Sequence, residues 1–150
     1  MALVLGVAGC ATEPARPAAT AVARFFLETP RGEGAQATLP RSEVTIAIQP
    51  KPVITEFDVA NVEIAEVELG RCLLFQLTAE GSRDLYRLTA ANQGRRLVLV
   101  VNGEPLGARR IEQPLEGGAV LIFVERPDAD LPALVRELRA TTVALREARK

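Results

Sequence analysis

The sequence predicts one α+β domain in which an antiparallel or mixed sheet carries two helices on one face. Two observations lead to this class. A strand–helix–strand pattern extends from Cys72 to Val101, and a second strand–helix pattern covers residues 119–140. The 150 residues, of which 48% are hydrophobic, are sufficient for one domain with its own core.

Three N-terminal segments are expected to form strands: residues 25–27, a short apolar run, and residues 43–49 and 62–69, in which apolar residues alternate. One face of residues 43–49 is expected to be buried, and the interrupted alternation of residues 62–69 indicates a bulge. Residues 30–37 are polar and contain glycine, which predicts a loop. Residues 53–60 are expected to hold one helical turn capped by Thr55.

The central unit begins with a strand over residues 72–77, which follows a tight turn at Gly70-Arg71 and is apolar on both faces. Thr78 is expected to cap the helix that follows, and Gly94 to end it. The buried face of this helix should carry Gly81, Leu85, Leu88, Thr89 and Asn92, and its exposed face Arg83, Asp84 and Arg87. Five consecutive apolar residues, 97–101, then predict a strand that is covered on both sides.

Beyond this unit, Asn102-Gly103 is a strong signal for a two-residue turn. The next strand is expected at residues 119–124, where it should be buried. A second helix opens at Pro127-Asp128 and should bury one face, formed by Leu131, Leu134, Val135 and Leu138. Residues 141–145 are β-prone and predict a last short strand. With right-handed crossovers this order predicts a split βαβ, or ferredoxin-like, core with additional N-terminal strands.

The N-terminus contains the most specific short motif of the chain. An apolar run ends in Val7-Ala8-Gly9-Cys10, which resembles a bacterial lipobox. The resemblance implies that residues 1–10 are a truncated lipoprotein signal peptide and that Cys10 is the lipidated residue. A complete signal would have a basic start and a longer apolar region, which a start codon upstream of Met1 would supply. The alternative is an apolar N-terminus with a cysteine at this position by chance.

An alanine- and proline-rich segment, residues 11–23, follows and is expected to act as an extended tether. The folded domain is expected over residues 24–150, which contain no run of the roughly 20 apolar residues that a membrane-spanning helix needs. In lipoprotein sorting, an aspartate after the lipidated cysteine favours the inner membrane. This position is Ala11, so the outer membrane is favoured.

A family resemblance covers about residues 53–140. It rests on these motifs: Leu77-Thr78-Ala79-Glu80-Gly81, Leu88-Thr89, Asn92, Gly94-Arg95-Arg96-Leu97, Asn102-Gly103 and Gly117-Gly118. Together they resemble the periplasmic head domain of SecD, the auxiliary subunit of the bacterial preprotein translocase. The resemblance implies a periplasmic domain that contacts other polypeptides.

The sequence departs from the SecD pattern in three respects. Asn102 stands where the family usually has aspartate, and Gly107-Ala108-Arg109 replaces a common Ser-Ala-Pro. The 150 residues also contain no counterpart of the six membrane helices through which SecD uses a proton gradient. Translocation activity is therefore not implied.

Few residues suggest catalysis. The sequence contains no histidine, the usual general base at neutral pH. Cys72 lies in an apolar strand and is expected to pack in the core, without a disulfide partner once Cys10 is lipidated. Ser42 and Ser82 lie outside any nucleophile motif. Alternating carboxylates at Glu63, Glu66 and Glu68 fit the solvent-exposed face of a strand better than a cation site. Asn92 is expected to form a hydrogen bond with the backbone of a loop.

The sequence therefore predicts no catalytic, cofactor-binding or metal-binding residues, and a protein that is not an enzyme. Its expected function is that of a membrane-tethered periplasmic lipoprotein whose domain is a protein-binding or accessory module of the cell envelope. The expected partners are envelope proteins or an extended polypeptide, together with the membrane through the lipid anchor. The net charge of −1 gives no reason to expect nucleic acid. A structural envelope component and an enzyme that uses carboxylates remain alternatives.

Overall fold

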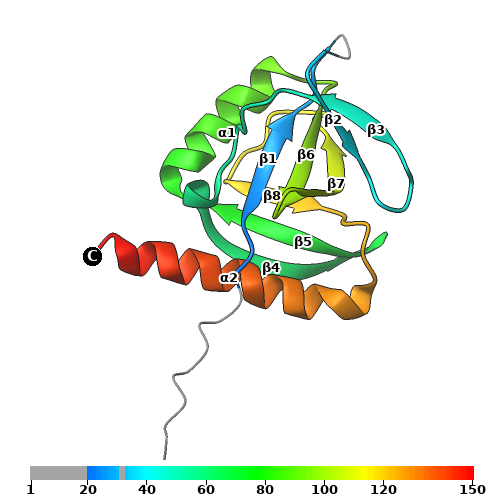
Figure 1. The fold of residues 1–150 in the computed structure, drawn as a ribbon. Coiled ribbons are helices and arrows are strands. Elements are labelled where there is room, and N and C mark those ends of the chain that lie inside the picture. Colours follow the sequence, from blue (N-terminus) through cyan, green and yellow to red (C-terminus); the bar gives the residue numbers. More distant parts are fainter. Residues whose placement is uncertain (1–19, 31–32) are drawn as a thin grey trace, which may run out of the picture.

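The computed structural model describes residues 20–30 and 33–150 (Figure 1). Within these residues the chain forms eight strands, two α-helices and two short 3-10 turns. In chain order they are β1 (Ala23–Leu27), β2 (Ala35–Thr38), β3 (Thr45–Ile48), η1 (Glu56–Asp58), β4 (Val59–Val67), β5 (Gly70–Leu77), α1 (Ala79–Ala91), β6 (Arg96–Val101), β7 (Glu104–Arg110), β8 (Ala119–Ile122), η2 (Asp128–Asp130) and α2 (Leu131–Ala148).

The α+β class with antiparallel strands and two helices is confirmed. The strands, however, are divided among three sheets, β1–β6–β7, β2–β3 and β4–β5–β8, whereas one sheet was expected. The reason is that β6 pairs with the N-terminal strand β1, so that the strands on either side of α1 belong to different sheets. We call β1–β6–β7 the first sheet and β4–β5–β8 the second sheet.

The two sheets curl towards each other and enclose the main core (Figure 1). They meet where β7 passes the end of β8, and the Glu125 amide donates to the Leu106 carbonyl at 2.7 Å. Gly107 permits this approach, because a Cβ atom at that position would overlap the Phe123 carbonyl. The replacement of the usual Ser-Ala-Pro by Gly107-Ala108-Arg109 thus falls at the junction between the sheets.

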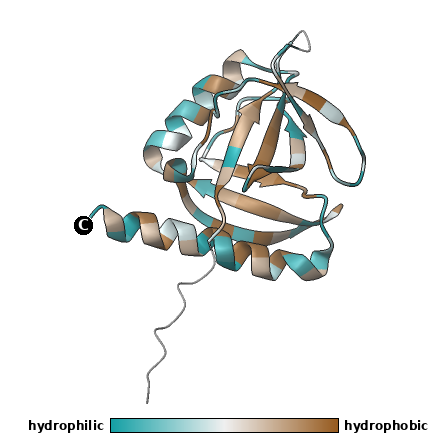
Figure 2. Ribbon diagram, viewed as in Figure 1, coloured by the Kyte–Doolittle hydropathy of each residue, from teal (hydrophilic) through white to brown (hydrophobic). Residues whose placement is uncertain are grey.

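The main core is built from the inner faces of both sheets and from both helices. At its centre the rings of Phe25 and Phe75 pack edge to face, with centroids 5.1 Å apart. Leu85 from α1 and Leu138 from α2 are buried in the same core. Figure 2 shows the corresponding alternation along both helices, with hydrophobic residues recurring between hydrophilic ones.

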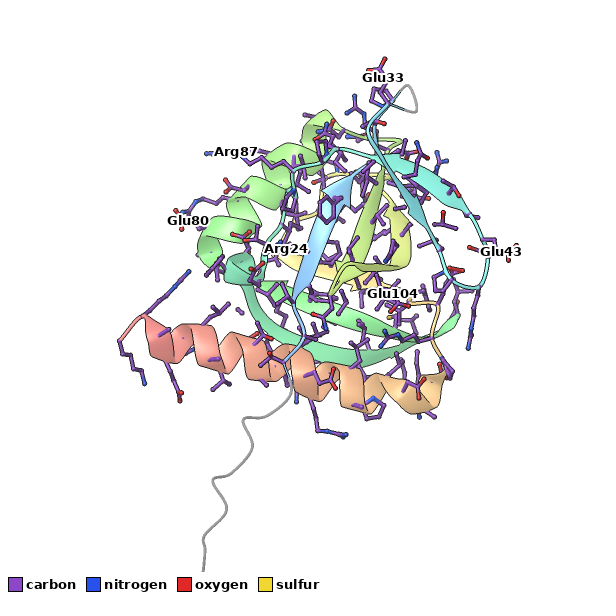
Figure 3. All side chains as sticks on the ribbon, in the orientation of Figure 1. Arg24, Glu33, Glu43, Glu80, Arg87 and Glu104 are labelled. Carbon is purple, nitrogen blue, oxygen red and sulfur yellow. The ribbon has the colours of Figure 1, made fainter. Side chains whose placement is uncertain are left out.

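The first helix follows its predicted register. The Thr78 hydroxyl accepts a hydrogen bond from the Gly81 amide at 3.1 Å and caps α1. Leu85 and Thr89 are buried and Leu88 is half-buried. The opposite face is exposed, and Figure 3 shows Glu80 and Arg87 directed away from the sheets.

Other predicted turns are confirmed with small shifts. Thr55 caps the single turn η1. The bulge expected within residues 62–69 is not found there, because the pairing of β4 with β5 is regular over that stretch and its register shift lies earlier, between Val59 and Asn61. β4 and β5 form the expected hairpin, although its turn lies at residues 68–69 and Gly70 already belongs to β5. Asn102 and Gly103 have φ angles of 49° and 82°, as a two-residue hairpin turn requires.

Four predictions about the elements are corrected by the structure. Residues 35–38, expected in a loop, form β2, and residues 104–110 form the unexpected strand β7. Residues 119–124 are buried on one face only, because Val120 and Ile122 point into the core while Leu121 and Phe123 are exposed. Residues 141–145 continue α2 instead of forming a strand, because the Thr141 hydroxyl bonds the Ala21 carbonyl at 2.6 Å and fixes the helix against the start of the domain.

The packed domain also begins earlier than residue 24. Ala21 and Ala23 are buried, and the Ala21 amide donates to the Glu137 carbonyl of α2 at 3.2 Å. The end of the expected tether therefore belongs to the fold. The signal peptide assigned to residues 1–10 and the rest of the tether up to residue 19 lie outside the described residues.

Candidate functional site: an uncovered sheet face

Among the described cysteine and serine residues, Cys72 is buried and both serines take part in hydrogen bonds within the fold. Cys10 lies outside the described residues. Cys72 is fully buried, as expected, but on the side of β5 opposite the main core, and burial raises the pKa of its thiol. Ser42 donates from its amide and its hydroxyl to the Glu125 carboxylate, at 2.7 and 3.1 Å. The Ser82 hydroxyl donates to the Thr78 carbonyl at 2.7 Å, within the first turn of α1.

The strand carboxylates are spread out along the second sheet. Glu63 accepts from the Asn61 side chain at 3.0 Å, and Glu66 pairs with Arg71 at 2.9 Å near the hairpin turn. Glu68 is exposed in that turn. Among residues 20–30 and 33–150 no group of three or more His, Cys, Asp or Glu side chains is placed to hold a metal ion.

Thr89, rather than Asn92, supports the loop beside α1. Its buried hydroxyl accepts from the Leu115 amide at 2.9 Å and donates to the Leu85 carbonyl at 2.8 Å. The Asn92 side chain instead bonds its own helix, at the Leu88 carbonyl. The sequence pointed to this face of α1 but assigned the loop contact to the wrong residue.

The outer face of the first sheet is covered by the chain itself. The β2–β3 hairpin packs over it and forms a second hydrophobic cluster. This cluster contains the buried residues Ala37, Leu39, Ile46, Ile48 and Val98, with Phe26, Val100 and Ala108 packed around them. At the far end of the hairpin the Ser42–Glu125 hydrogen bonds attach it to the segment that follows β8. Figure 3 labels Glu43 at this end.

The outer face of the second sheet differs. The register pairs Leu74 with Leu121 and Ala65 with Cys72, so that these residues share the side opposite the main core. Besides Ala65 and the fully buried Cys72, four larger apolar side chains on this side belong to neither hydrophobic cluster, and three of them are exposed by 37–42%. They are Val67, Leu74, Leu121 and Phe123, of which Leu74 is half-buried. We call these four residues the open face.

The surroundings of the open face are polar and fixed. The Arg109 guanidinium donates to the Leu121 carbonyl at 2.8 Å, at the margin of β8. On the other margin, Arg139 of α2 donates to the Val62 carbonyl of β4 at 2.7 Å. Beyond the hairpin turn, Leu69 is 86% exposed and extends the apolar surface past the end of the sheet. An apolar centre with a polar rim is typical of a protein contact surface.

A smaller hollow, of about 180 Å³, lies between η1 and the end of α2. Its wall includes Phe57, which is 52% exposed and carries the Arg149 guanidinium 5.8 Å from its ring centroid. Glu56 also lines the hollow, but two hydrogen bonds from Arg24 hold its carboxylate and lower its pKa. The hollow therefore offers one aromatic ring and cationic side chains and no uncommitted acid among its described lining residues.

None of the helices in the described part of the chain is long and apolar enough to cross a membrane. Neither a family model nor a curated protein matches the sequence.

Solved structures, in contrast, do resemble the fold. SecDF in its super-membrane-facing form aligns with a TM-score of 0.66 and 23% identity, over 82% of this chain and 19% of that chain. A structure of SecDF described as a membrane component that enhances protein export aligns with a TM-score of 0.64 and 23% identity, over 82% of this chain and 64% of the other. SecDF from Thermus thermophilus, a translocon-associated membrane protein, aligns with a TM-score of 0.56 and 20% identity, over 83% of this chain and 20% of that chain. The chain thus spans about a fifth of the longer SecDF chains, and the resemblance to SecD is confirmed at the level of the fold.

Proposed function

We propose that this protein is a lipid-anchored accessory module on the periplasmic side of a bacterial membrane and that it binds polypeptide segments on the open face. The observation that carries the proposal is the exposed apolar surface of the second sheet on a fold shared with SecDF. One of the SecDF structures is described as enhancing protein export, an activity in which polypeptides are handled. Translocation activity of its own forms no part of the proposal.

The chemistry of the open face suits an extended or partly folded polypeptide. Leu121 is held on the short strand β8 and Phe123 follows directly after its end, so both side chains are preorganised and lose little freedom on binding. A partner that covers them would remove apolar surface from water, at about 25 cal/mol per Å². Polar groups at the margins, such as Arg109 and Glu63, are held by hydrogen bonds within the domain and give the apolar surface a polar rim.

The location rests on the N-terminal motif. Val7-Ala8-Gly9-Cys10 resembles a lipobox, and a cysteine that carries two or three acyl chains would hold the protein stably on a bilayer. We expect palmitate to label the full chain when it is expressed behind a complete lipoprotein signal peptide, and Cys10→Ser to abolish the label and release the protein from membranes. An unlabelled wild-type chain would remove the anchor from the proposal and leave the open face unaffected.

Polypeptide binding is tested with purified full-length Cys10→Ser protein and a permanently unfolded probe, reduced and alkylated α-lactalbumin. We expect Leu121→Asp with Phe123→Ser to weaken binding at least roughly tenfold, since two buried apolar contacts are lost. The matched control is Val143→Asp with Tyr86→Ser, which changes two exposed residues of the helices in the same way. Equal weakening in both double variants, or no binding by the starting protein, would contradict the proposal.

A further inference from the structure

The second helix carries an unusual share of the positive charge of the chain. Residues 131–150 contain four arginines and one lysine against two glutamates, a net charge of +3, whereas the whole chain has −1. The excess is not spread evenly around α2. Arg136, Arg139 and Arg146 occupy one exposed side of α2, and Lys150 follows two residues beyond its end; we call these four residues the basic stripe.

Helical spacing aligns the basic stripe. Its members follow one another at intervals of three, seven and four residues, and Val143, which is 50% exposed, lies between Arg139 and Arg146 on the same side. Leu131, Leu134 and Leu138 face the core on another side of the helix. One face of α2 is thus packed, while another is cationic with an exposed aliphatic side chain in its middle. This is the pattern of a helix that lies on a charged surface.

The charges of the basic stripe are not neutralised inside the molecule. None of the five ion pairs among the described residues involves a cation of α2. Arg139 donates to the Val62 carbonyl at 2.7 Å and Arg146 to the Ala60 carbonyl at 3.5 Å. These neutral acceptors hold the two side chains along β4 without cancelling their charge. Glu147 is exposed beside the stripe and offsets part of it.

The N-terminal chain enters the domain at this helix. The Ala21 amide donates to the Glu137 carbonyl, and the Thr141 hydroxyl donates to the Ala21 carbonyl at 2.6 Å. Figure 1 shows β1 beginning against the middle of α2. Thr20 follows Cys10 at a distance of ten positions along the sequence, and an extended chain of that length spans at most roughly 35 Å. An anchor at Cys10 would therefore keep α2 close to the bilayer.

We propose that the basic stripe of α2 contacts the anionic headgroups of phospholipids and fixes the orientation of the domain on the membrane. The inference rests on the proposed anchor for its geometry, but the charge complementarity exists in the unlipidated chain as well. Cations within about a Debye length of an anionic bilayer are attracted to it, and the attraction weakens as salt is added. The basic stripe adjoins the open face, since Arg139 also lies at one margin of that face.

The test uses full-length Cys10→Ser protein, so that no acyl chain contributes, and sedimentation with two kinds of vesicles. We expect binding to vesicles that contain phosphatidylglycerol, loss of this binding in high salt, and little binding to pure phosphatidylcholine. Arg136→Gln with Arg146→Gln should weaken binding to the anionic vesicles roughly tenfold or more. The matched control, Arg83→Gln with Arg87→Gln on the exposed face of α1, should leave it unchanged.

Equal binding to both vesicle types, or an equal loss in the two double variants, would overturn the proposal. Circular dichroism of each variant checks that the fold is retained. The outcome is independent of the anchor and of the open face, because palmitate labelling and unfolded-probe binding report on those separately. If palmitate labels the chain but the unlipidated protein does not bind anionic vesicles, the proposed function stands and the orientation by α2 is excluded.

Discussion

The two large sheets of this domain differ in how much of their outer faces is covered by the rest of the chain. The first sheet is covered by the β2–β3 hairpin, which buries Val98 and Ile46 in a second cluster. The second sheet leaves Leu121 and Phe123 exposed by 37% and 42%. Both outer faces carry large apolar side chains, so the presence of such side chains does not separate them. What separates them is whether the chain supplies its own cover, and the uncovered face is therefore the one available to another molecule.

The largest expected effect is a difference in the free energy of unfolding between two alanine substitutions, one on each outer face. Ile46→Ala should reduce the free energy of unfolding by about 2–5 kcal/mol, because Ile46 is buried in the second cluster. Leu121→Ala should cost less than about 1 kcal/mol, because much of its side chain already contacts water. Urea unfolding of the full chain measures both. A larger loss at Leu121 would mean that the open face is covered in solution.

A smaller effect is expected inside the main core, where Thr89 connects α1 to the loop before β8. Thr89→Val preserves the shape but leaves the buried Leu115 amide without its acceptor, at a cost of about 1–3 kcal/mol. Thr142→Val is the control on α2, because its hydroxyl bonds only within its own helix at 3.3 Å. If both variants unfold at the same urea midpoint, the Thr89–Leu115 hydrogen bond does not stabilise the fold.

The next smaller effect is the pH dependence of the stability that an ion pair of the first sheet contributes. Two side-chain hydrogen bonds from Arg96, at 2.7 and 3.1 Å, lower the pKa of Glu28 at the margin of the first sheet. The folded pKa thus lies below the unfolded value of about 4.3, so this stabilisation is present above that pH and is lost as pH falls through the folded pKa. Glu28→Gln should cost roughly 1 kcal/mol at pH 7 and much less near pH 2. A cost that is the same at both pH values would contradict the assignment.

The smallest effect is expected at the matching ion pair of the second sheet. Glu66 and Arg71 are 72% and 47% exposed at the end of the β4–β5 hairpin. Glu66→Gln should change the free energy of unfolding by less than about 0.5 kcal/mol, and added salt should remove even that. A cost equal to that of Glu28→Gln would show that the hairpin end is more enclosed than the structure indicates.

The sequence predicted the parts of the fold that local pattern controls. Thr78, Leu85 and the turn at Asn102-Gly103 were placed correctly because caps, helical periodicity and hairpin turns depend on neighbouring residues. β2 was missed because it buries only Ala37, and β7 because Pro105 and Gly107 interrupt its alternation. Both strands owe their existence to tertiary pairing that a local pattern does not show.

The exposure of the open face could not be predicted from the sequence, because it too depends on tertiary packing. The apolar run over residues 119–124 is typical of a strand buried on both sides, and the sequence was interpreted in that way. Exposure of Leu121 and Phe123 follows only from the placement of the β2–β3 hairpin over the other sheet. The extension of α2 through residues 141–145 was missed likewise, since Thr141 is fixed by Ala21, 120 residues away.

The central claim, that the open face receives a polypeptide partner, is tested most directly by photo-crosslinking in cells that make the anchored chain. A photoreactive phenylalanine derivative would replace Phe123 on the open face or Tyr86 on the exposed side of α1, two aromatic residues of similar exposure. We expect discrete adducts with other polypeptides from position 123 and none from position 86. Adducts of equal yield from both positions, or from position 86 alone, would contradict the account.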